Sequence, residues 1–194
     1  MKTQVESETN LKVGGYIINP TTKIPRDILI AFETATKELI GASYKPLILV
    51  GTQLVHGTNC KLIALKTVMN RSQLKSLVEI VIHVPLPTEK EKPVVMSDSI
   101  RELITEYEDI DGGWSIVGST SSYPQRVASA LLLFARAGYT PLICAAQQVV
   151  AGMNFMIYCS NVDILNPNKR GLVSITIYQN LKGELFINRI ENLL

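Results

Sequence analysis

Residues 148–154 read QVVAGMN and residues 53–59 read QLVHGTN, so a Q-x-V-x-G-x-N pattern occurs twice at an offset of 148 − 53 = 95 residues. Neighbouring features repeat in the same register, among them a Tyr-x-Pro-Leu-Ile string that begins at Tyr44 and again at Tyr139. A period of about 95 residues is too long for a solenoid unit and suits a small domain. The sequence therefore predicts a tandem duplication of one domain.

Each copy is predicted to contain one amphipathic helix. Pro25 suits the opening turn of a helix, and apolar residues then follow at the spacing of one helical face until Gly41, a residue type that often ends helices. Pro124 and Gly138 bracket the equivalent stretch of the second copy. We expect the apolar face of each helix to pack on the core.

Each helix is followed by apolar runs rich in β-branched residues, which predict strands. The third run of each copy alternates apolar residues with others, as expected of a sheet with one covered face. The predicted strands are 47–55, 62–68, 77–84 and 93–96 in the first copy, and 142–150, 155–159, 172–178 and 185–190 in the second. The pattern indicates an α+β fold with two domains, each one helix packed on a four- to five-stranded antiparallel sheet. We place the domains at 1–96 and 112–194, joined by a linker at 97–111.

Composition excludes several classes of function. The formal net charge is +2 over 194 residues, which gives no general attraction to nucleic acid or to an acidic membrane. Cys60, Cys144 and Cys159 occupy unmatched positions in the two copies, which argues against a disulfide framework. The polar first ten residues lack a signal peptide, and no apolar run is long enough to span a bilayer. We expect a cytoplasmic protein; export by a signal-independent route stays open.

The repeated string is expected at the tip of a β-hairpin, because Gly and Asn tolerate the positive φ of tight turns. Turn chemistry alone explains those two residue types. It does not explain the apolar tips, which contain Val55 in the first copy and residues 149–151 (VVA) in the second. Exposed apolar side chains at a turn are typical of a contact surface.

These features together resemble the cystatin superfamily, and the second copy resembles its stefin branch, the intracellular cystatins without disulfides. The resemblance rests on a glycine pair before each helix, the Q-x-V-x-G hairpin and a Leu-Pro-Gly-like second hairpin, of which each copy keeps two members. It implies two cystatin-like domains and a reversible, tight-binding inhibitor of papain-like (cathepsin-type) cysteine proteases. Three segments would form a wedge that blocks the active-site cleft without offering a peptide bond to the catalytic thiolate.

The resemblance also assigns the protease-binding residues. In the first copy they are Gly14, Gly15, Gln53, Leu54, Val55, His56, Gly57, Leu86 and Pro87. In the second copy they are Gly112, Gly113, Gln148, Val149, Val150, Ala151, Gly152, Leu181 and Gly183. A wedge built on a rigid sheet would be preorganised and would lose little entropy on binding.

Two departures from the family pattern stand out. His56 replaces the usual alanine, either as a variable exposed residue or as a group sensitive to pH. Gly112 follows a linker rather than a free terminus. Two other binding functions remain open: inhibition of zinc carboxypeptidases, as in latexin-type proteins, and a non-inhibitory protein-binding module.

Enzymatic functions find little support. His56 and His83 have no equivalents in the second copy, and the chain has neither metal-ligand spacing nor a phosphate-binding glycine loop. We therefore expect a non-enzymatic monomer without cofactor or metal. Its partner would be a protease, rather than a nucleic acid or a membrane.

Overall fold

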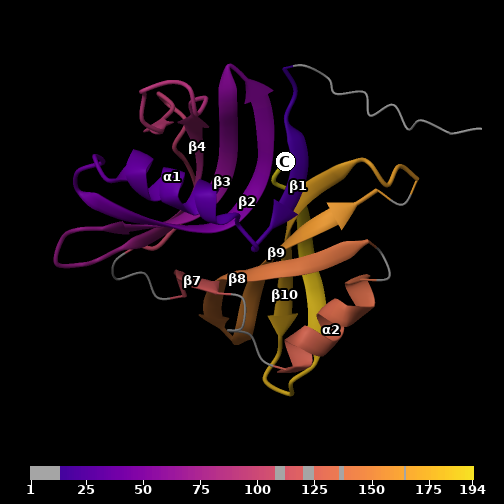
Figure 1. Cartoon of the computed structure of the whole chain (residues 1–194). Coiled ribbons are helices and arrows are strands. Elements are labelled where there is room, and N and C mark those ends of the chain that lie inside the picture. Colours follow the sequence, from indigo (N-terminus) through magenta and orange to yellow (C-terminus); the bar gives the residue numbers. More distant parts are fainter. Residues whose placement is uncertain (1–13, 108–111, 120–124, 136–137, 164) are drawn as a thin grey trace, which may run out of the picture.

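The structure, a computed structural model, describes residues 14–107, 112–119, 125–135, 138–163 and 165–194. They form two antiparallel sheets, each accompanied by one helix (Figure 1). The first sheet contains β1 (Ile17–Thr21), β2 (Ala42–Val55), β3 (Gly57–Val68), β4 (Lys75–Val84), β5 (Val94–Val95) and β6 (Arg101–Thr105). The second contains β7 (Trp114–Ser119), β8 (Tyr139–Val150), β9 (Gly152–Val162), β10 (Arg170–Gln179) and β11 (Leu185–Asn192). The helices are α1 (Arg26–Thr36) and α2 (Gln125–Ala135). The strand orders are β1-β2-β3-β4-β5, with β6 also paired to β4, and β7-β8-β9-β10-β11.

The expected α+β class is wrong, because antiparallel strands dominate the described residues: eleven strands stand beside two helices. β1, β6 and β7 come from segments in which the sequence indicated no strand. Most of the other strands are longer than predicted; β2, for example, begins at Ala42. β5 is shorter than the predicted strand 93–96. In addition, each helix covers one face of its sheet, while the opposite faces of the two sheets pack on each other. The molecule is therefore mostly β.

The helices lie where the sequence predicts them. α1 begins directly after Pro25, and its fully buried Phe32 packs into a core with β3 and β4. α2 contributes Val127 and Leu131 to the corresponding core of the second sheet. Pro124, which is predicted to open α2, lies outside the described residues. Neither helix in the described part of the chain has the length and hydrophobicity needed to cross a bilayer.

A third apolar core joins the two sheets on the faces that the helices leave open. Ile63 on β3 and Tyr158 on β9 belong to it, whereas their neighbours Leu62 and Ile157 belong to the cores under the helices. The alternating runs predict one covered face, but Leu77 on the opposite face of β4 is also fully buried. That prediction is wrong because the second copy of the repeat covers this face.

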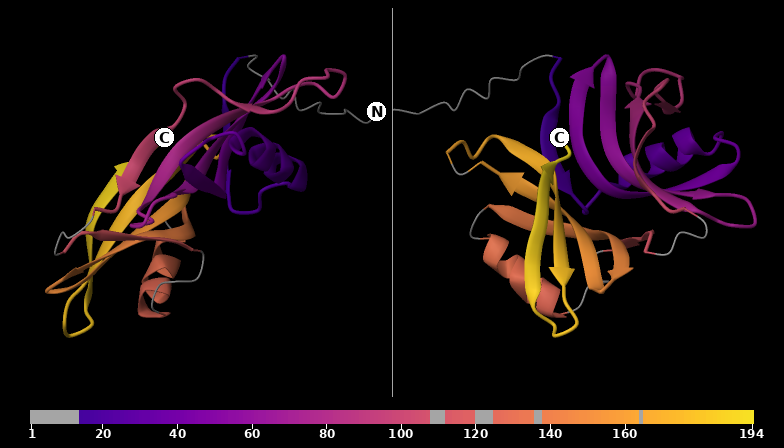
Figure 2. Two further views of the ribbon diagram at one scale, coloured as in Figure 1. Left: turned by 90° about the vertical axis from the view of Figure 1, so that its left-hand side faces the viewer. Right: turned by 180° about the vertical axis from the view of Figure 1, so that it is seen from behind.

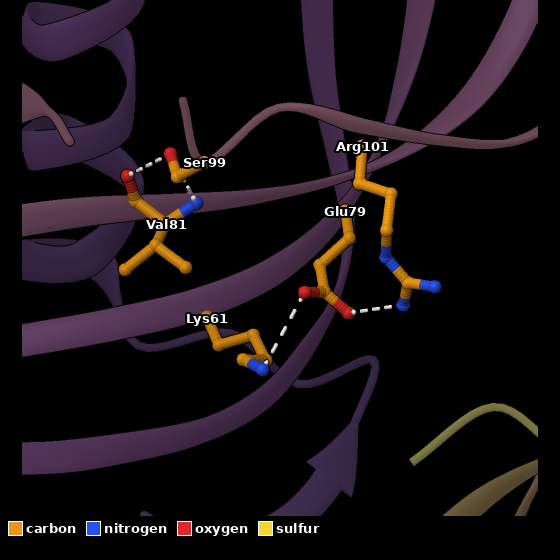
Figure 3. A network of polar contacts seen from close by, with 5 residues as sticks. All are labelled: Lys61, Glu79, Val81, Ser99 and Arg101. Carbon is orange, nitrogen blue, oxygen red and sulfur yellow. Dashed lines mark hydrogen bonds and ion pairs between the residues drawn. The ribbon is translucent and has the colours of Figure 1, made fainter. Parts of the chain in front are cut away.

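Part of the predicted linker at 97–111 is a strand of the first sheet, since β6 pairs with β4. Figure 3 shows the ion pairs beside it: Arg101 Nη2 lies 3.0 Å and Lys61 Nζ 3.4 Å from the buried carboxylate of Glu79. Two cations thus neutralise a carboxylate that would otherwise be costly to bury. Residues 101–105 are anchored to the first sheet, and 108–111 lie outside the described residues.

The same segment also contacts both sheets through hydrogen bonds. Ser99 Oγ accepts the amide of Val81 at 3.3 Å and donates to its carbonyl at 3.1 Å (Figure 3). Farther along, the Glu106 carboxylate accepts the amide of Lys75 on β4 at 3.1 Å and that of Ile116 on β7 at 2.6 Å. One side chain therefore links the two sheets at the point where the chain crosses between them.

Candidate functional site

Each Q-x-V-x-G string lies at the tip of a β-hairpin, as predicted. Val55 pairs with Gly57 across a tip formed by His56, at the end of the β2–β3 hairpin. Val150 pairs with Gly152 in the same way at the end of the β8–β9 hairpin. The repeat in the sequence is thus a repeat in local structure.

The glycine of each string is required by close packing against the next strand. Gly57 has φ +102° and Gly152 has φ +129°, values that favour glycine. A Cβ at Gly57 would lie 2.4 Å from the carbonyl oxygen of Val84, at the end of β4. A Cβ at Gly152 would lie 2.2 Å from that of Gln179, at the end of β10. Both glycines let the first hairpin lie directly against the start of the second.

A polar relay ties the first hairpin to the glycine segment that precedes α1. Gln53 Nε2 donates to the carbonyl oxygen of Gly14 at 2.8 Å, and Asn59 Nδ2 donates to Gln53 Oε1 at 2.8 Å. Asn59 does not lie in the turn, as its tolerance of positive φ suggested; it lies on β3, directly opposite Gln53. Its buried amide orients the glutamine, a role that the sequence analysis missed.

The second copy repeats this relay. Gln148 Nε2 donates to the carbonyl oxygen of Gly112 at 2.8 Å, and Asn154 Nδ2 donates to Gln148 Oε1 at 2.7 Å. The same three residue types therefore hold the glycine segment against the hairpin in both sheets. A hydrogen bond between fixed partners of this kind contributes about 1 kcal/mol and orders the segment that it holds.

In the first copy the second hairpin joins the other two segments through side chains. His83 Nδ1 lies 2.8 Å from Asn59 Oδ1, which extends the relay to β4. At the tip, His56 Nε2 lies 2.6 Å from Glu89 Oε1 in the loop between β4 and β5. Glu89 also accepts the amide of Leu86 at 3.0 Å. The loop is thereby closed against the first hairpin.

In the second copy a different set of contacts holds the second hairpin. The hydroxyl of Tyr178 on β10 donates to the carbonyl oxygen of Ala151 at the tip of the first hairpin. The side chain of Asn180 accepts the amides of Lys182 and Glu184, each at 2.9 Å, and so shapes the β10–β11 loop. The three predicted segments meet at one end of this sheet as well.

The exposed apolar side chains of the two copies correspond one to one. They are Leu54, Val55 and Leu86, exposed by 60%, 39% and 36%, and Val149, Val150 and Leu181, exposed by 66%, 41% and 86%. We call residues 14–15, 53–57 and 86–87 the first wedge, and residues 112–113, 148–152 and 181–183 the second wedge. Packing explains the glycines, glutamines and asparagines, but it does not explain why these apolar side chains face solvent.

The two wedges point away from each other. In Figure 1 the β2–β3 turn lies at the top of the molecule and the β10–β11 loop at the bottom, and the rotated views of Figure 2 agree. Because strand pairing places the β8–β9 tip beside the end of β10, the whole second wedge lies at that far end. A partner at one wedge would therefore leave the other accessible.

The three cysteines belong to the cores. Burial raises the pKa of Cys60 and of Cys144 to about 11, and that of Cys159 to about 12. Such thiols stay protonated at neutral pH and make poor nucleophiles and metal ligands. Within the described ranges, no cluster of three or more His, Cys, Asp or Glu side chains is arranged to hold a metal ion.

The family resemblance rests on the sequence motifs quoted above. A scan against protein-family models found no match for this chain, and a search of curated proteins found no significant match.

Proposed function

We propose that this chain is a reversible, tight-binding inhibitor of papain-like cysteine proteases, related to the cystatin superfamily. One observation carries the proposal: at one end of each sheet, the same Gly–Gln–Asn relay holds the glycine segment against the first hairpin, and apolar side chains of the first and second hairpins are exposed beside it. Burial of these side chains in the cleft of a protease would stabilise the complex, since burial of apolar surface contributes about 25 cal/mol per Å².

Inhibition by a wedge requires shape rather than chemistry. A thiol protease must hold a substrate carbonyl within about 3.5 Å of its nucleophile, so a body that fills the cleft without placing a carbonyl there blocks turnover. The relays support this role, because they hold the glycine segment and the first hairpin in one arrangement before binding. Little conformational entropy is then lost on association.

We propose inhibition by both wedges. Because they lie at opposite ends of the molecule, one protease could bind at each end. Titration of papain with the intact chain tests this. Leu54→Asp and Val149→Asp occupy corresponding positions, and both side chains are more than half exposed, so the fold should tolerate either change. Each variant should inactivate one wedge and halve the number of protease molecules bound.

Matched controls come from exposed apolar residues outside the wedges. Met69 is 71% exposed in the connection between β3 and β4, and Leu165 is 95% exposed in that between β9 and β10. Met69→Asp and Leu165→Asp should inhibit papain as the wild type does. Absence of inhibition by the intact chain would overturn the proposal, and inhibition of a zinc carboxypeptidase alone would replace it with the latexin-type function.

A further inference from the structure

β11 forms a free edge of the second sheet. It is last in the strand order, and in the described part of the chain it pairs only with β10. Phe186, Ile187 and Ile190 on this strand are 50%, 51% and 45% exposed. The corresponding edge of the first sheet is divided between β5 and β6, two short strands. A long edge strand offers a row of unpaired backbone groups to another strand, whereas very short edge strands offer few.

The charges on β11 are self-complementary. Arg189 and Glu191 flank Ile190, and their side chains pair with each other at 2.6 Å while remaining 68% and 41% exposed. An antiparallel pairing of two such strands about a two-fold axis through Ile190 would place each Arg189 opposite the Glu191 of the other chain. Opposite charges in directly facing positions stabilise a strand pair, and like charges destabilise it.

The backbone agrees with this axis. The amide of Leu193 donates to Leu172 of the preceding strand at 2.9 Å, and Glu191 lies opposite Ser174 in the same ladder. Because alternate residues of an antiparallel strand direct their N–H and C=O to the same side, those of Ile190 point away from β10. Two Ile190 residues facing each other across a two-fold axis can then exchange both hydrogen bonds.

We propose that β11 pairs with β11 of a second copy of this chain, antiparallel about a two-fold axis through Ile190, so that the second sheet continues across the dimer. A β-bulge between the partners of Thr176 and Ile177 interrupts the regular ladder, which confines the pairing to the end of β11 after Ile187. The sequence predicts a monomer. We propose a dimer instead, because no other strand in the described residues pairs with the free edge of β11.

The dimer leaves the wedges free. Ile190 is nine residues beyond Leu181 of the second wedge, a separation of roughly 30 Å along an extended strand. Dimerisation therefore does not depend on protease inhibition. The two proposals are tested by different measurements, and either stands if the other fails.

Charge reversal tests the pairing directly. Sedimentation velocity over a concentration series should show that the wild type reaches twice the monomer mass. Arg189→Glu and Glu191→Arg should each shift the equilibrium to monomer, because like charges then face each other. The double variant R189E/E191R should dimerise again. Lys37→Glu, a charge reversal at the exposed end of α1 on the first sheet, should leave the dimer unchanged.

A wild type that stays monomeric throughout the series would overturn the proposal, and so would a dimer that survives both single reversals. Circular dichroism shows whether each variant is folded. Amide hydrogen exchange of the wild type gives an independent test that needs no variant. The Ile190 amide should become protected as the protein concentration rises. An exchange rate that does not change with concentration would also overturn the proposal.

Discussion

The two wedges share one construction and differ in how the second hairpin is attached. In both, a glutamine on the first hairpin holds the glycine segment, and an asparagine opposite holds the glutamine. In the first wedge His56 and Glu89 connect the two hairpins, whereas in the second the hydroxyl of Tyr178 reaches a backbone carbonyl. The shared contacts hold the glycine segment against the hairpin that carries the apolar tip. The differing contacts show that the second hairpin can be held in the same arrangement by different kinds of hydrogen bond.

Substitution of the glycine at a hairpin tip, a feature shared by both wedges, should weaken papain inhibition more than any change to the contacts that differ. Gly152→Ala places a Cβ 2.2 Å from the carbonyl oxygen of Gln179 and retains an unfavourable φ, so we expect about 3 kcal/mol of strain. Papain inhibition by the second wedge should then weaken by about a hundredfold, measured with the first wedge inactivated by Leu54→Asp.

Gly41→Ala separates the strain caused by a positive φ from the strain caused by a close contact of the added Cβ. Gly41 has φ +88°, but a Cβ there would meet nothing within 4 Å. This variant should lower the stability by about 1 kcal/mol without affecting inhibition. If Gly152→Ala weakened inhibition no more than Gly41→Ala does, the close approach of the hairpins would not matter for binding.

The buried thiols should make the second sheet the more sensitive one at alkaline pH. Burial raises the pKa of Cys144 to about 11 and that of Cys159 to about 12, from an ordinary value of 9.0. Above about pH 9 the unfolded chain releases these protons and the folded chain keeps them, so stability falls as pH rises. We expect a loss of about 1 kcal/mol for each thiol between pH 9 and pH 10.

Urea unfolding over this pH range measures the loss. The double variant C144A/C159A should remove most of the pH dependence contributed by cysteine, and Cys60→Ala should remove a smaller part, since it takes away one thiol of three. Equal slopes in all three proteins would show that the buried thiols do not govern the alkaline limit.

The relay should have a moderate effect on binding. Gln148→Ala and Gln53→Ala each remove a hydrogen bond to the preceding glycine segment, worth about 1 kcal/mol. Each should weaken papain inhibition by its own wedge by about fivefold. Each should also lower the melting temperature, because the opposing asparagine amide loses its hydrogen-bond acceptor. An effect in one wedge but not in the other would show that the two relays are not equivalent.

Loss of the contact between His56 and Glu89 should have the smallest effect on papain inhibition. The His56 side chain is 80% exposed, and exposed ion pairs contribute at most about 1 kcal/mol. His56→Ala gives the first wedge the residue found at position 151 of the second. Papain inhibition by the first wedge should change by less than about threefold. A larger change would mean that the ion pair with Glu89 sets the position of the second hairpin.

Much of the fold was predictable because the repeat aligns its elements. The helix after Pro25, the hairpin tips and the long strands all follow from periodicity and turn residues. β6 was not, because its residues 101–105 (RELIT) show little alternation and their pairing with β4 depends on distant contacts. The α+β class failed for a related reason. Ile63 and Leu77 pack on the other sheet, and a pattern read along one strand does not say what covers its second face.

The candidate site was predictable in part. The motif located both hairpins, but the function of Asn59 depends on its register opposite Gln53, which is known only once the turn is known. His83 and Tyr178 extend the two wedges by different contacts, and neither belongs to the repeated string. Their positions at the ends of β4 and β10 were the available signal, since both strands lead into the second hairpins.

The central claim is that each end of the molecule carries a wedge for a papain-like protease. Titration of papain of known active-site concentration with the intact chain tests it most directly. The account predicts that one chain inactivates two papain molecules, and that Leu54→Asp or Val149→Asp reduces this to one. A chain that leaves papain fully active at every ratio would contradict it.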